Sequence, residues 1–145
     1  MATRPLPVVS TQRELAEALE DRSDRDLDRA AEDFGVDRLL ELVFAEVQRR
    51  FLPDRTRGVH ATIGWDIGGR RRRAHWSLLV ADGTCRVTPG APDAPDLTLR
   101  FALPDFLRFM AGTLDGMYAY LTGKLLLDGD LVLSESMAGW FRQGD

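Results

Sequence analysis

Cysteine and histidine are scarce in this chain, which contains one Cys and two His among its 145 residues. A single cysteine excludes an intramolecular disulfide, and these three residues are too few for the usual zinc-type metal sites. The chain has no run of 18 apolar residues to form a transmembrane helix. Its N-terminus also lacks the apolar segment of a secretion signal. We therefore expect a cytoplasmic protein that binds no metal and no cofactor.

The charge balance argues against nucleic acid as a partner. The chain has 23 acidic and 19 basic residues, a net charge of −4, so nonspecific binding to phosphates has no overall electrostatic support. One basic cluster stands out at a predicted hairpin tip. It could make transient contact with anionic membrane headgroups, or its charges could simply be solvated. The cluster consists of Arg70, Arg71, Arg72 and Arg73.

Three helices are predicted before the first strand. Ser10 or Thr11 can N-cap a short helix, and Ser23 can cap a second. A third helix, over residues 36–51, carries one apolar stripe at helical spacing. The two prolines within residues 1–10 predict a loosely ordered start. The stripe of the third helix contains Val36, Leu39, Leu40, Val43, Phe44, Val47 and Phe51.

Residues 58–101 change from a helical period to the period of two that is typical of strands. Apolar residues alternate over 59–67 and 74–80, and two further strands follow before residue 102. Each strand has one apolar face, which indicates an antiparallel sheet covered by helices on that face. With a short strand near residues 125–127, we expect an α+β fold with about five mostly antiparallel strands.

The register of the predicted sheet follows from its hairpin turn. Asp82-Gly83 is a strong two-residue turn signal, and it places Val80 opposite Cys85 on the buried face. Cys85 then serves as a small apolar residue. The same parity puts Trp65 and Trp76 on the buried face. His75 falls near Asp66 on the other face, as an oriented base or as an ordinary cross-strand polar pair.

The last third of the chain predicts short helices around the short strand. Pro104 suits the first turn of a helix that Gly112 ends, and Asp115 begins a second helix. Asp130 can cap a final helix. The apolar stripe of that helix contains Leu133, Met137, Trp140 and Phe141.

From about Phe44 to Phe141, the order of these signals resembles the SCP2 (sterol carrier protein 2) family of lipid-binding domains. The resemblance implies a small mixed sheet whose helices enclose an apolar tunnel that binds sterols, fatty acyl chains or other lipids without covalent chemistry. Residues 36–145 would form the SCP2-like domain and residues 1–35 an N-terminal helical extension. The residues that carry the resemblance are Trp76-Ser77-Leu78 with Asp82-Gly83, Pro95-Asp96-Leu97-Thr98-Leu99, Asp105-Phe106-Leu107 with Gly112, and Gly123-Lys124-Leu125 with Gly129-Asp130.

We therefore predict non-catalytic binding, with possible transfer, of a sterol, fatty acyl or other hydrophobic ligand in an internal apolar cavity. On spacing alone, the aromatic and methionine residues of the last third also fit an ordinary core. Tyr118, Tyr120 and Trp140 could orient a polar head. The residues predicted to contact the ligand are Trp65, Trp76, Leu99, Phe106, Phe109, Met110, Met117, Tyr118, Leu121, Leu125, Met137, Trp140 and Phe141.

Two other functions stay open at this point. The chain could be an interaction or dimerisation module of a larger enzyme system, including a homodimer, with Trp140 and Phe141 packed on another chain. It could also be an enzyme that folds a hydrophobic substrate in the apolar pocket, with Asp66, Asp115 or a tyrosine as acid or base. No residue pair in the sequence is positioned for such catalysis.

Overall fold

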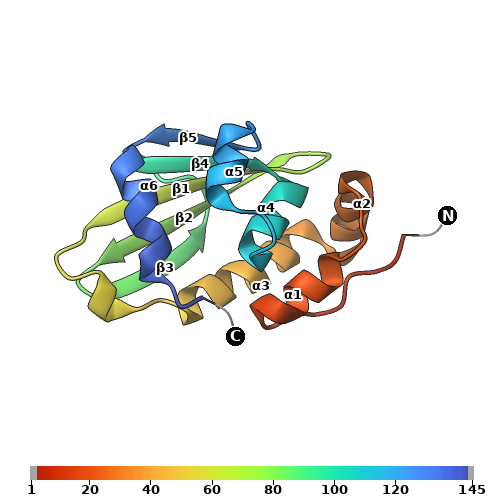
Figure 1. The fold of residues 1–145 in the computed structure, drawn as a ribbon, viewed down its shortest axis with the longest axis horizontal. Helices are drawn as coiled ribbons and strands as arrows, with labels where there is room; N and C mark the ends of the chain where they lie inside the picture. Colours follow the sequence, from red (N-terminus) through yellow and green to blue (C-terminus); the bar gives the residue numbers. More distant parts are fainter. Residues whose placement is uncertain (1–2, 144–145) are drawn as a thin grey trace.

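Three helices, a sheet interrupted by two more helices, and a final helix make up the chain (Figure 1). The computed structural model describes residues 3–143. In chain order the elements are α1 (Gln12–Leu19), α2 (Asp24–Phe34), α3 (Val36–Arg49), the 3-10 turn η1 (Pro53–Arg55), β1 (Ala61–Gly68), β2 (Arg73–Ala81), β3 (Thr84–Pro89), β4 (Leu97–Ala102), α4 (Leu103–Ala111), α5 (Gly116–Leu121), β5 (Leu125–Gly129), α6 (Leu131–Met137) and the 3-10 turn η2 (Ala138–Trp140).

The five strands form one mixed sheet in the order β3-β2-β1-β4-β5. Trp65 pairs with Trp76 and Val80 with Cys85, so the register predicted from the turn is confirmed. Both tryptophans are buried and contact Phe44 of α3, so they lie on the face that the helices cover. The α+β class and the five strands are confirmed as well.

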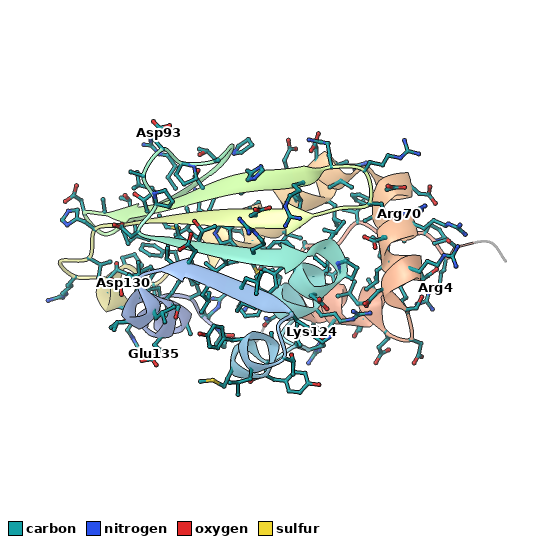
Figure 2. All side chains as sticks on the ribbon, turned by 90° about the horizontal axis from the view of Figure 1, so that it is seen from above. Arg4, Arg70, Asp93, Lys124, Asp130 and Glu135 are labelled. Atoms are coloured by element: carbon teal, nitrogen blue, oxygen red, sulfur yellow. The ribbon has the colours of Figure 1, made fainter. Side chains whose placement is uncertain are left out.

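One pairing differs from the all-antiparallel sheet expected for the first four strands, because β4 runs parallel to β1. After β3 the chain crosses the face of the sheet that lies away from the helices, where Figure 2 shows Asp93. On this path Pro92 packs over Gly64, where an added Cβ would lie 3.4 Å from the Pro92 ring and 3.2 Å from Thr98 Oγ1. Asp96 then donates its N–H to the Thr62 carbonyl at 2.8 Å, which starts β4 alongside β1.

The core is centred on an aromatic cluster between α3, α4 and the sheet. The Phe44 ring of α3 is fully buried and stacks on Trp76 with 4.6 Å between centroids. It also meets the edge of Trp65 at 5.7 Å and lies 5.6 Å from Phe106 of α4. This cluster fixes α3 and α4 against the centre of the sheet.

The N-terminal segment is more ordered than its prolines predicted. Leu6 and Val9 are buried in the common core. Arg22, itself buried, donates through Nε to the Ala18 carbonyl at 2.8 Å and through Nη2 to the Pro5 carbonyl at 3.2 Å. The expectation of a loose start was therefore wrong, because a buried guanidinium ties the segment to the turn after α1.

The end of the chain also differs from the prediction, because Phe141 is not part of the final helix. α6 ends at Met137 and is followed directly by η2. Phe141 then has an extended backbone and forms a β-bridge with Phe51. Leu52 donates its N–H to the Trp140 carbonyl at 2.7 Å. The predicted helical stripe therefore ends early because residues 140–142 pair with the segment after α3.

Candidate functional site: an apolar cavity

A cavity of about 410 Å³ lies between α1, α3, α4 and the C-terminal segment, with Trp65 of β1 at its border. The exposed lining residues Ser10, Asp115 and Gln143 mark where it opens to solvent. Most of its surface is apolar. The apolar lining residues are Val9, Leu15, Leu42, Val43, Val47, Trp65, Phe109, Met110, Leu114, Met137, Ala138 and Phe141.

A hydrogen-bonded polar rim borders part of the cavity. Arg50 is buried, and it donates through Nε to Glu46 Oε1 at 2.7 Å and through Nη1 to the Arg142 carbonyl at 2.9 Å. Arg49 donates through Nη2 to the Ser10 carbonyl at 2.7 Å. The rim therefore joins three parts of the chain that are far apart in sequence, and it places charged and polar groups beside the apolar surface.

The cavity offers binding surface more than reactive groups. Its two carboxylates have structural partners, because Glu46 is ion-paired with Arg50 and Asp115 Oδ2 accepts the Tyr118 N–H at 2.9 Å. Within residues 3–143, neither a histidine nor the cysteine lines it. Trp65 contributes a different feature, since its buried Nε1 has no hydrogen-bond partner in the described structure.

The residues predicted to contact the ligand are divided among three locations. Five line the cavity: Trp65, Phe109, Met110, Met137 and Phe141. Five others are buried outside its lining: Trp76, Leu99, Phe106, Leu125 and Trp140. Three are exposed on α5: Met117, Tyr118 and Leu121. Tyr118, Tyr120 and Trp140, which were suggested to orient a polar head, also lie outside the lining. The two tyrosines are exposed, and Trp140 is buried. The role of each residue in ligand binding stays a prediction.

Two groups of lining residues were not predicted as ligand contacts. Leu42, Val43 and Val47 come from α3, whose apolar stripe pointed to a buried face but not to a cavity. Val9 and Leu15 come from the N-terminal segment, which the resemblance left outside the domain. Their apolar character was the only signal in the sequence.

The polar cluster around Asp66 lies on the opposite face of the sheet from the cavity. The Asp66 carboxylate accepts from Arg73 Nε at 2.5 Å and from Arg100 Nε at 2.9 Å, and His75 Nε2 is 3.8 Å away. Burial opposes ionisation of Asp66, but the hydrogen bonds from both arginines outweigh it and lower its pKa. This arrangement is a cross-strand ion-pair network, and it keeps the carboxylate charged.

The arginine cluster at the hairpin tip is paired with acidic residues of the N-terminal helices. Arg70 and Arg71 each lie 3.7 Å from a Glu32 oxygen of α2, and Arg72 Nη2 lies 2.5 Å from Asp37 Oδ1 of α3. Figure 2 shows Arg70 beside α2. The hairpin tip is thus held against the N-terminal helices, although the pairs are largely exposed.

Other candidate sites give little chemistry. Cys85 is half-buried, and burial raises the pKa of its thiol to about 11. No group of three or more potential metal ligands occurs among the described residues. In the same part of the chain, no helix has the length and apolar character that crossing a membrane requires.

The fold and the cavity together define a small α+β domain with an apolar chamber under helices on one face of the sheet. The SCP-2 sterol transfer family model matches residues 42–142, so the chain belongs to that family. The resemblance noted in the sequence is confirmed.

Similar proteins include two that are much longer than this chain and one of which the match covers most. The Mus musculus peroxisomal multifunctional enzyme type 2 is 29% identical over 101 residues, which is 66% of this chain but only 14% of that protein. The sec-alkylsulfatase Pisa1 from Pseudomonas sp. is similar over 72% of this chain and 16% of its own, with 23% identity and a TM-score of 0.61. Palmitated SCP2L2 from Aedes aegypti is similar over 67% of this chain and 88% of its own, with 24% identity and a TM-score of 0.59. Both solved structures share the fold.

Proposed function

We propose that this protein binds one hydrophobic molecule, such as a fatty acid or a sterol, in the apolar cavity without chemically changing it. The observation that carries the proposal is the cavity of about 410 Å³ with its mostly apolar wall. This volume lies within the range of about 300–1,000 Å³ that is typical of small-molecule sites in proteins. The palmitated form of the similar Aedes aegypti protein supports an acyl chain as occupant.

The polar features of the site favour a ligand with a hydrogen-bonding group. Buried donors in proteins are nearly always paired. Trp65 lines the cavity, and its buried Nε1–H has no hydrogen-bond partner in the described structure. A carbonyl, carboxylate or hydroxyl oxygen of the ligand would satisfy it. The apolar body would contribute about 0.8 kcal/mol for each buried methylene.

A titration with a fluorescent fatty acid tests the proposal. The fluorescence should saturate at one probe per chain, and unlabelled palmitate or cholesterol should displace the probe. A signal that rises without saturation, or that neither competitor reverses, would contradict binding in the cavity.

A second candidate function is association with another chain, including a homodimer. Trp140 and Phe141, which were expected to pack on another chain, do not provide such a surface, because Trp140 is buried and Phe141 packs on Phe51 of its own chain, 6.0 Å between centroids. Exposed apolar residues in α5, β5 and α6 favour it instead. They are Met117, Tyr118, Tyr120, Leu121, Leu126, Leu131 and Val132. Sedimentation of the protein with and without Leu121→Glu would show whether the exposed residues of α5 hold two chains together.

Transient membrane contact through the arginine cluster and a cytoplasmic location also stay predictions. The Arg71 side chain is 88% exposed, and its Nε lies 3.7 Å from Glu32 Oε1, beyond hydrogen-bond distance. Its guanidinium can therefore exchange a carboxylate for a lipid phosphate. Co-sedimentation with anionic but not neutral vesicles would support this contact.

A further inference from the structure

The segment before the third helix supplies one wall of the cavity. Its lining residues all precede residue 42, where the match to the family begins. α1 packs on α4, as Figure 1 shows, and the preceding residues reach the cavity mouth. The residues of this N-terminal wall are Val9, Ser10, Thr11, Gln12 and Leu15.

Specific contacts hold the N-terminal wall in place. Gln12 Nε2 donates to the Met110 carbonyl at 3.0 Å, and Arg49 Nη2 donates to the Ser10 carbonyl at 2.7 Å. Gln12 also fits closely over Gly112, where an added Cβ would lie 3.1 Å from Gln12 Nε2. The wall is therefore docked on α3 and α4 at several points.

The side chains of the wall are arranged for contact with an occupant. Val9 and Leu15 are only 7% and 6% exposed, while the neighbouring Val8 is 59% exposed and lies outside the lining. A buried apolar side chain that borders unfilled space lacks van der Waals partners on that side. An apolar ligand would supply those partners.

We propose that residues 9–15 form a specificity-determining wall, which limits the length and width of the apolar body that the cavity accepts. The inference rests on the proposed ligand-binding function. It assigns ligand contacts to a segment outside the family match, so this chain should select ligands by a surface that the matched stretch alone does not contain.

Methyl-labelled full-length protein mixed with unlabelled palmitate tests the contacts without any substitution. Intermolecular nuclear Overhauser effects should connect palmitate methylenes with the methyl groups of Val9 and Leu15, but not with those of Val8. Effects confined to Val43, Val47 and other residues of the matched stretch would overturn the wall while leaving the proposed function intact. Absence of any palmitate binding would instead overturn the proposed function and the wall that rests on it.

A matched pair of variants tests specificity. Val9→Trp should weaken palmitate binding by about fifteenfold, equivalent to the loss of roughly two buried methylenes, and should weaken octanoate binding less. Val8→Trp should bind both acids as the unmodified chain does. Equal changes for both acids and both variants would overturn the inference.

A third variant covers the case in which Val9→Trp fails to fold, which thermal melting would reveal. Leu15→Ala enlarges the cavity, so it should shift the preference toward longer or wider ligands in a series of saturated fatty acids. An unchanged preference in a folded Leu15→Ala protein would overturn the inference.

Discussion

Filling the cavity from α4 should block the ligand, and two methionines of this chain provide a matched comparison. Met110 is half-buried and lines the cavity, whereas Met117 is 62% exposed on α5 and does not line it. We therefore expect Met110→Trp to lose most of its affinity for a fatty acid and Met117→Trp to retain it. The hydrogen bond from Gln12 to residue 110 involves the backbone carbonyl and is kept in the variant.

The size of the effect follows from the space that the new side chain takes. Tryptophan has about six more heavy atoms than methionine, and its indole would occupy space in the cavity of about 410 Å³ that a ligand otherwise fills. If only two ligand methylenes are displaced into water, the loss is about 1.6 kcal/mol, or roughly fifteenfold in the dissociation constant.

Fluorescent fatty acid titrations of both variants measure this difference directly, with thermal melting as a check that each variant folds. Equal affinities for Met110→Trp, Met117→Trp and the unmodified protein would refute the assignment of the cavity as the binding site. Equal losses in both variants would refute it too, because Met117 is outside the cavity.

Three further predictions concern the sheet, the cysteine and the final helix. Asp66→Asn should lower the free energy of unfolding at pH 7 by about 2 kcal/mol, since it weakens hydrogen bonds to charged arginines. Because the folded pKa of Asp66 lies below the unfolded value of about 3.9, this stabilisation is present at neutral pH and lost as the pH falls below about 4. If urea unfolding showed the same difference in stability between Asp66→Asn and the unmodified protein at pH 3 as at pH 7, the prediction would be contradicted. Cys85, with its pKa raised to about 11, should have about 0.1% thiolate at pH 8 and alkylate about a hundredfold more slowly when folded than in denaturant, and similar rates would contradict its burial. Ligand should slow amide hydrogen exchange in α6 (Leu131–Met137), because its Met137 lines the cavity. Exchange in α6 that is as slow as in β1 before ligand is added would show that α6 does not open.

Local chemistry made much of the fold predictable. Thr11, Ser23, Asp115 and Asp130 each accept a backbone N–H at the start of the helix they were expected to begin or cap, because capping depends only on nearby residues. The face shared by Trp65 and Trp76 followed from strand alternation alone. Strand parity and helix caps are therefore properties that a single sequence reveals.

Features that depend on the path of a loop were not predictable in the same way. The direction of β4 follows from a loop that crosses the sheet and brings the Asp96 N–H to the Thr62 carbonyl, and nothing in the strand itself encodes that direction. Phe141 lies outside the final helix because it forms a β-bridge with Phe51, in the segment after α3. In both cases a distant part of the chain decides the local geometry.

The cavity was the hardest feature to locate from the sequence. One of its walls depends on contacts such as the hydrogen bond between Gln12 and Met110, which are 98 residues apart. In α5, by contrast, apolar residues that were predicted to contact the ligand are exposed. This helix spans only six residues and buries Ala119, so the larger apolar residues beside it lie at the surface. Residue type alone did not distinguish these two situations.

Native mass spectrometry of the purified full-length protein, followed by solvent extraction, tests the central claim most directly. The account predicts a species heavier than the bare chain by one hydrophobic molecule, or one such adduct per chain when palmitate is added, and loss of that adduct in Met110→Trp. A bare chain that takes up neither palmitate nor cholesterol would contradict the claim that the cavity is a ligand-binding site.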